Sequence, residues 1–125
     1  IRPVPESVLE FTLSRELTAK AVETAVKRHA GKLVNGDGGK AVYAVGKDLT
    51  AVKWVIGTGG ALTRLPGGTE IMASVTGEKK NALIPRQGAA VLLDNYYVFA
   101  ALGVLAALHP TGAAYLMRES MGIER

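Results

Sequence analysis

The stretch that decides the fold reads Val52-Lys53-Trp54-Val55-Ile56-Gly57-Thr58-Gly59-Gly60-Ala61-Leu62. Its β-branched and aromatic first half favours a strand, and the strand ends abruptly at Gly57. Three glycines within four residues leave Thr58 as the only side chain of the turn, so a flat ligand could approach the backbone closely. A helix starts directly after the turn and points its first N–H groups outward. In open α/β sheets, ligands bind outside the carboxyl ends of the strands, and this turn lies at such an end.

Two common nucleotide motifs do not fit this turn. No Gly-Lys-Ser/Thr follows, so it is not a Walker A loop, and the third glycine of the dinucleotide fingerprint is absent. A plain tight turn without a ligand remains the alternative interpretation.

Helical and extended segments alternate on both sides of the turn, which is typical of an α/β domain. Upstream, Ser14 is the expected N-cap of a helix over 15–30 that Gly31 ends. The expected elements are a short helix at 5–13, the helix at 15–30, a loop at 35–39, a strand at 41–45, short helices at 61–65 and 69–75, extended segments at 81–85 and 89–93, and helices at 95–108 and 111–121. Asp94 with Asn95, and Thr111, are the expected caps of the last two helices, and Gly122 ends the chain's last helix. We treat residues 1–125 as one domain.

Composition narrows the possible functions. The net charge of +4 comes from scattered basic residues, and the aromatic residues are one Trp, four Tyr and two Phe, which argues against nucleic-acid binding. The absence of cysteine excludes disulfides, thiolate catalysis and cysteine-bound metals, and it fits a cytoplasmic protein. The uncharged run over 96–108 is shorter than the roughly 20 residues that span a membrane, so a buried helix is expected there.

The residues Ile56-Gly57-Thr58-Gly59-Gly60-Ala61 resemble the adenosine motif of the actin/Hsp70/sugar-kinase superfamily. In that superfamily, a paired-glycine turn packs on the adenine and ribose of ATP. The later stretch over 94–105 resembles the superfamily's connecting helix. There Ala100, Ala101 and Gly103 carry little bulk, so a second helix could cross closely at the hinge between two lobes.

A longer, ordered series of segments narrows the resemblance to the glutamate mutase (methylaspartate mutase) accessory protein family, of the MutL or GlmL type, which is unrelated to the mismatch-repair protein of similar name. The series consists of Arg28-His29-Ala30-Gly31, Gly46-Lys47-Asp48-Leu49-Thr50, the stretch 56–62, Leu83-Ile84-Pro85-Arg86, Leu93-Asp94 with Tyr97, Gly103-Val104-Leu105, and His109-Pro110 with Ala113-Ala114. It covers most of residues 15–122. The fold class that it implies is the C-terminal, adenosine-binding subdomain of a two-lobed, actin-like (ribonuclease H-like) ATPase.

The resemblance also implies a function. Family members are thought to act as ATP-dependent reactivators, or chaperones, of adenosylcobalamin-dependent mutases, so mutase subunits are the implied partners. The implied cofactors are ATP or ADP with Mg²⁺, and the phosphate loops and the metal-binding acid lie in the N-terminal part of such proteins. We therefore expect no catalytic or metal-binding residue here, and ATPase activity only in the full-length protein. The expected nucleotide contacts are Gly57, Thr58, Gly59, Gly60, Ala61 and Arg64.

Several roles stay open at this point. Thr58 is expected to bond ribose or adenine, or else to make a local turn bond. Arg64 is expected to stack on adenine or reach a phosphate, or else to be solvated. Asp94 fits a helix cap better than a functional acid. A small-molecule kinase of the same superfamily and a non-catalytic interaction module are the alternative functions.

Overall fold

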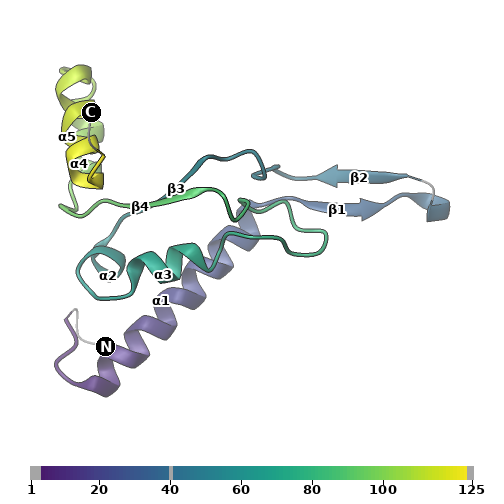
Figure 1. Cartoon of the computed structure of the whole chain (residues 1–125), viewed down its shortest axis with the longest axis horizontal. Helices are drawn as coiled ribbons and strands as arrows, with labels where there is room; N and C mark the ends of the chain where they lie inside the picture. The colour runs from purple at the N-terminus through teal and green to yellow at the C-terminus, as the bar shows by residue number, and fades with distance from the viewer. Residues whose placement is uncertain (1–3, 40, 124–125) are drawn as a thin grey trace.

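A computed structural model describes residues 4–39 and 41–123 and confirms a mixed α/β chain. The elements in order are α1 (Val8–His29), β1 (Lys32–Asn35), a 3-10 turn (Asp37–Gly39), β2 (Val42–Val45), β3 (Trp54–Gly57), α2 (Gly60–Thr63), α3 (Gly68–Ala73), β4 (Ala90–Leu93), α4 (Phe99–Leu105) and α5 (Pro110–Met121). The strands form two separate two-stranded sheets, β1–β2 and β3–β4. Figure 1 shows the β1–β2 hairpin and the α4–α5 pair at opposite ends of the molecule.

The centre of the chain is a β–α–β unit. β3 and β4 are parallel, with Trp54 opposite Ala90 and Gly57 opposite Leu93, and α2 and α3 form the connection that a parallel pair requires. One face of the sheet is covered by α3 and α1. The core on that face consists of buried Leu62, Ile71 and Met72, with Ala19, Val22, Val55, Val91 and Leu93 packed against them. The predicted strand into Gly57, the extended segment at 89–93 and both short helices are thus confirmed.

The first helix is longer than predicted. It begins at Val8 rather than 15, and the Ser7 side chain caps it by accepting the N–H of Glu10 at 3.2 Å. Ser14 lies inside the helix, where its carbonyl accepts the Thr18 hydroxyl at 2.7 Å. The predicted break before residue 15 was therefore wrong. No Gly or Pro occurs between Pro5 and Gly31, so nothing stops the helix before residue 15.

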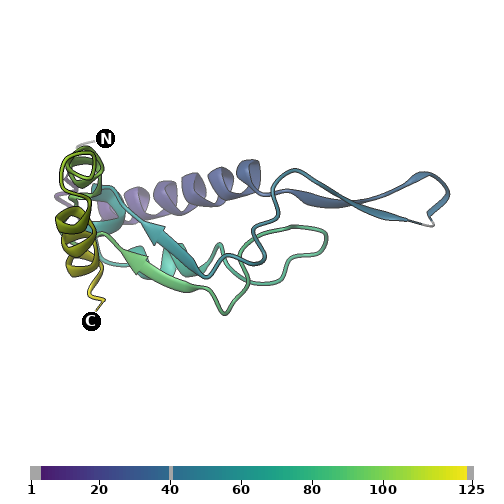
Figure 2. The same cartoon turned by 90° about the horizontal axis from the view of Figure 1, so that it is seen from above.

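Gly31 does not end the first helix in the predicted way. The C-cap is Ala30 in extended backbone, while Gly31 lies against Gly46 at the base of the hairpin. A Cβ on Gly31 would lie 2.6 Å from the Val45 carbonyl oxygen, so this close approach explains the glycine. β1 was not predicted as a strand, whereas β2 and the loop at 35–39 were. The hairpin projects away from the core (Figures 1 and 2).

Both C-terminal helices begin at residues other than those predicted. α4 begins at Phe99, because residues 95–98 form a turn in which Tyr97 adopts φ 54°. The helix predicted over 95–108 is thus shortened to seven residues. α5 begins with Pro110 at its first position after His109, and not with a Thr111 cap, while Gly122 ends it in the left-handed conformation as predicted.

The predicted extended segment at 81–85 is not a regular strand. It makes an isolated bridge between Lys32 and Ala82. Within residues 4–39 and 41–123, no helix is both long and apolar enough to cross a membrane.

Candidate ligand site at the glycine turn

The glycine turn lies at the carboxyl end of β3, at the same end of the sheet as the carboxyl end of β4, which leads to α4 and α5 (Figure 1). Gly57 closes the strand, Gly59 is the N-cap of α2, and Gly60 is the first helical residue. The N–H groups of Leu62 and Thr63 both donate to the Gly59 carbonyl at 3.0 Å. The position at a strand end agrees with the sequence analysis.

The three glycines of the turn have different structural reasons. Gly57 is buried, and a Cβ there would lie 2.8 Å from Leu93 Cδ2 and 3.0 Å from Met72 Cγ, so core packing requires it. Gly59 has φ 98° and ψ 146°, a conformation essentially reserved for glycine. Gly60 lies in helical backbone, and a Cβ there would meet no atom within 4 Å. Of these three glycines, only Gly60 is required neither by side-chain packing nor by backbone conformation.

A hollow of about 290 Å³ opens beside the turn. It brings together Gly60, Ala61 and Arg64 of the predicted contacts, and its other lining residues are Val4, Ser14 and Leu65. The other three predicted contacts, Gly57, Thr58 and Gly59, do not line it. The predicted set therefore divides into residues at an open surface and residues that hold the turn.

Arg64 extends from the end of α2 toward the segment that follows β4. Its Nη2 lies 3.5 Å from the Tyr96 carbonyl oxygen, which is too long for a strong hydrogen bond. The Arg64 side chain is exposed, as are the rings of Tyr96 and Tyr97. The guanidinium is therefore available to contact a ligand at this edge.

Asp94 ties the turn to the last two helices. Its side chain is fully buried and accepts four hydrogen bonds, two on each oxygen. Oδ2 accepts from the Thr58 hydroxyl at 2.9 Å and the Phe99 N–H at 3.0 Å. Oδ1 accepts from the Val98 N–H at 3.1 Å and the Ser120 hydroxyl at 2.5 Å. The N-cap residue of α4 is Val98 and not Asp94 as predicted, but the Asp94 oxygens accept the Val98 and Phe99 N–H groups at the start of that helix. The Thr58 hydroxyl donates to Asp94 across the fold instead of making a local turn bond.

Ser120 is the residue that sequence reasoning missed. It is fully buried on α5, and besides bonding Asp94 it accepts the Tyr96 N–H on its hydroxyl at 3.0 Å. Its carbonyl accepts the Asn95 N–H at 3.0 Å and the Asn95 Nδ2 at 2.9 Å. A serine within an amphipathic helix carries no sequence signal for such a contact, because its partners lie about 25 residues away.

The network determines the charge of Asp94. Burial by itself raises the pKa of this carboxyl, but hydrogen bonds from Ser120, from the Phe99 and Val98 N–H groups and from Thr58 together outweigh it and hold the pKa below its usual value. Asp94 is therefore ionised at neutral pH. Its oxygens are already engaged by four donors, so it is poorly suited to bind a metal ion.

No group of three or more His, Asp or Glu side chains that could hold a metal ion occurs among the residues that the structure describes. Mg²⁺ is usually held by one or two carboxylates together with waters and phosphate oxygens, and both oxygens of Asp94 beside the turn are already engaged by protein donors. The turn presents an open backbone surface at Gly60 with a nearby cationic side chain, Arg64.

Together, these features define an α/β chain with a candidate ligand-binding turn at the carboxyl end of a β–α–β unit. A family model described as "MutL protein" matches residues 1–121, and the chain belongs to this family, which confirms the resemblance noted in the sequence. The chain is similar to "Protein MutL" of Clostridium tetanomorphum, with 30% identity over 122 residues. That match covers 95% of this chain and 26% of the relative, so the chain spans about a quarter of the relative's length. No solved structure matches the chain.

Proposed function

We propose that the Gly57–Ala61 turn holds the adenosine end of ATP in the full-length protein. The observation that carries this proposal is Gly60, a glycine in helical backbone that faces open space. Glycine in helical backbone is less favourable than alanine, by up to about 1 kcal/mol in a helix interior and by less at the first helical position that Gly60 occupies, so a bare backbone here has a small cost that an approaching ligand would explain. Arg64 beside the same hollow supplies a planar cation that can stack on adenine.

The architecture of the full-length protein is part of this proposal. The chain would form the C-terminal, adenosine-binding subdomain of an actin-like, two-lobed ATPase, with Mg²⁺ and the phosphates of ATP held by other parts of the polypeptide. Two observations support a larger sheet. β3 pairs with β4 alone among the described strands, and Trp54 and Ile56 remain exposed on it. Parallel sheets normally have both faces covered, so this pair is expected to be completed by further structure.

Family membership gives the proposal its biological role. We propose that the protein is an accessory factor of an adenosylcobalamin-dependent mutase such as glutamate mutase, and that ATP-driven movement of the lobes reactivates the mutase. In this role the chain's own residues bind and orient adenosine. The Asp94 network would transmit movement, because it connects the turn through Thr58 to the starts of α4 and, through Ser120, to α5.

The test is calorimetry of ATP binding to the full-length protein. Gly60→Val places bulk in the open space and should weaken binding at least tenfold, about 1.4 kcal/mol. Gly112→Val is the matched control, because Gly112 is also a helical glycine and a Cβ there would meet only His109, at 4.0 Å. Unchanged affinity in the Gly60 variant would refute the site. Absence of ATP binding by the unmodified protein would favour a non-catalytic interaction module, and phosphoryl transfer to a small substrate would favour a kinase.

A further inference from the structure

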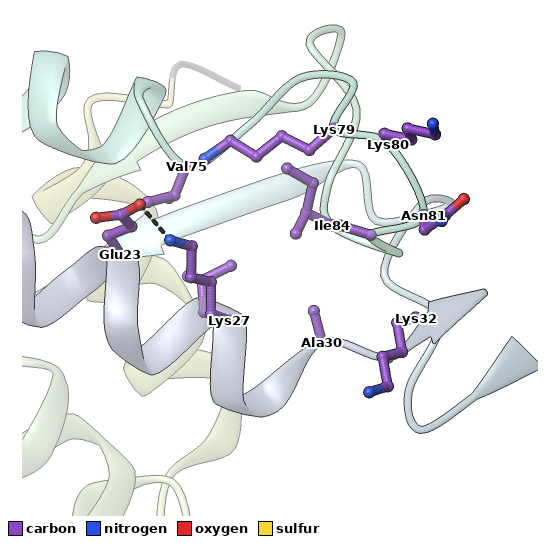
Figure 3. A pocket seen from close by; sticks show the side chains of 12 residues that line it. Glu23, Lys27, Ala30, Lys32, Val75, Lys79, Lys80, Asn81 and Ile84 are labelled. Atoms are coloured by element: carbon purple, nitrogen blue, oxygen red, sulfur yellow. Dashed lines mark ion pairs between the residues drawn. The ribbon is translucent and has the colours of Figure 1, made fainter. Parts of the chain in front are cut away.

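A second pocket lies at the hairpin end of the molecule, away from the glycine turn. It has a volume of about 260 Å³ and lies between the last turn of α1, the start of β1 and the segment 75–84 (Figure 3). Its apolar lining consists of Val26, Ala30, Val75, Ala82 and Ile84. Ligand pockets for drug-sized molecules usually exceed about 300 Å³, so this pocket suits a single side chain better than a nucleotide.

The pocket is positively charged. Lys27, Lys32, Lys79, Lys80 and one glutamate, Glu23, line it. The negative charge of Glu23 is already balanced by ion pairs, at 2.6 Å to Lys27 Nζ and 2.9 Å to Lys20 Nζ. Hydrogen bonds from these lysines lower the pKa of Glu23 to about 2. Within the described part of the chain, no ion pair joins Lys32, Lys79 or Lys80 to an acid. The excess positive charge is therefore available to a partner.

The lysines lie along the sides of the pocket and at one of its ends. In Figure 3, Lys79 extends along one side toward Val75, and Lys27 rises from α1 toward Glu23 on the other. Lys80 and Asn81 point away from the hollow at its far end. An occupant would thus contact aliphatic side chains at the bottom of the pocket and ammonium groups at its rim.

Backbone hydrogen bonds fix the walls of the pocket. The Leu33 N–H donates to the Asn81 carbonyl at 2.8 Å, and the Leu83 N–H donates to the Gly31 carbonyl at 2.9 Å. The Ala82 N–H donates to the Lys79 carbonyl at 3.0 Å, which closes the turn that carries the lysines. The site is therefore formed before a partner arrives, which reduces the entropy lost on binding.

The pocket continues onto one face of the hairpin. Lys32 lies opposite Val45, and Val34 lies opposite Tyr43, so these four side chains share a face of the β1–β2 pair. Tyr43 and Val45 are more than half exposed. A two-stranded hairpin that projects from the core gains little stability by itself (Figure 2). An apolar face on such an arm is suited to a macromolecule.

We propose that this pocket and the hairpin face carrying Val34, Tyr43 and Val45 form a docking surface for a partner protein. The segment that binds there presents an apolar side chain flanked by carboxylates. The apolar side chain enters the pocket, the carboxylates pair with Lys32 and Lys79, and the adjoining backbone lies along the hairpin. A nucleic acid fits less well, because bases stack on aromatic rings and the floor of the pocket is aliphatic.

The test uses the full-length protein and a short fluorescent peptide in which leucine is flanked on each side by two glutamates. We expect saturable binding that Lys79→Glu and Lys32→Glu each weaken at least tenfold, about 1.4 kcal/mol. Lys53→Glu is the control, because it makes the same charge change outside the pocket. A peptide with serine in place of leucine should also bind at least tenfold more weakly.

Four results would overturn the proposal. Equal losses in the Lys53 and Lys79 variants would show unspecific charge attraction. Unchanged binding in the Lys79 and Lys32 variants would place the peptide elsewhere. Glutarate binding as tightly as the peptide would assign the pocket to a small dicarboxylate. Tighter binding of a single-stranded oligonucleotide, in competition with the peptide, would assign the surface to nucleic acid.

Discussion

Replacing Asp94 with asparagine removes the charge at the centre of the network and preserves its shape. Each carboxylate oxygen accepts one backbone N–H, from Val98 on Oδ1 and from Phe99 on Oδ2. The hydroxyls of Thr58 and Ser120 can rotate to accept from an amide, but a backbone N–H cannot. In either orientation of the asparagine, one of the two buried N–H groups therefore faces an NH₂ group and loses its acceptor.

The size of the effect follows from this loss. A hydrogen bond to a charged group contributes about 1.5–3 kcal/mol, and a buried unpaired donor costs about 1–3 kcal/mol. These figures overlap, so we expect Asp94→Asn to lower the free energy of unfolding by about 2–4 kcal/mol. For a chain of this size, that corresponds to a fall in Tm of roughly 8–16 °C.

Thermal unfolding of residues 1–125, followed by circular dichroism, measures the change. Asp48→Asn is the matched control, because Asp48 is exposed and its side chain accepts hydrogen bonds from the neighbouring Thr50, at 2.9 Å from the N–H and 2.6 Å from the hydroxyl. The control should shift Tm little. A Tm for Asp94→Asn within 2 °C of the unmodified chain, a limit set by about 0.5 kcal/mol of stability, would refute the reasoning that the network holds these elements together.

Three further outcomes follow from the structure. Because the pKa of Asp94 is lowered in the folded state, the stabilisation that its charge provides is complete above the unfolded-state pKa and is lost as pH falls through the folded-state pKa. The urea midpoint of Asp94→Asn should therefore fall less steeply from neutral to acid pH than that of the unmodified chain. Parallel curves for the two proteins would contradict this. Gly57→Ala should lower the free energy of unfolding by about 1–3 kcal/mol through overpacking, whereas Gly60→Ala should cost nothing, and equal urea midpoints for both would contradict the division of roles. Gly103→Leu should leave the Tm of residues 1–125 unchanged, because a Cβ there meets no atom within 4 Å, yet reduce ATP turnover of the full-length protein if a second lobe packs on α4; unchanged turnover would place Gly103 in solvent.

Local sequence signals predicted the elements that depend on local conformation. The apolar run into Gly57, the glycine turn, β4 and the Gly122 stop were all read correctly from propensity and from glycine's freedom at positive φ. β1 was not, because Lys32–Asn35 is short and half polar and becomes a strand only by pairing with β2. Pairing depends on contacts between distant residues, which propensity does not encode.

The same limit applies to the candidate site. The glycines were enough to locate the turn in the sequence. They did not show why each position must be glycine, since the need at Gly57 arises from Leu93 and Met72 on other elements. The contact between Thr58 and Asp94 spans 36 residues, and that between Ser120 and Asp94 spans 26. The capping preference of Asp94 indicated a helix start nearby because capping is local, but α4 begins at Phe99, four residues later than predicted, and the role of Asp94 as the junction of three elements required the fold.

Photoaffinity labelling tests the central claim, adenosine at the glycine turn, most directly. The full-length protein is irradiated with 8-azido-ATP, digested with trypsin, and mapped by mass spectrometry, with excess ATP as competitor. Cleavage after Lys53 and Arg64 places the whole turn on one peptide, Trp54 to Arg64. The account predicts ATP-protected label on this peptide or on the neighbouring segment with Tyr96 and Tyr97. Label that ATP suppresses but that lies wholly on peptides outside these two segments would contradict it.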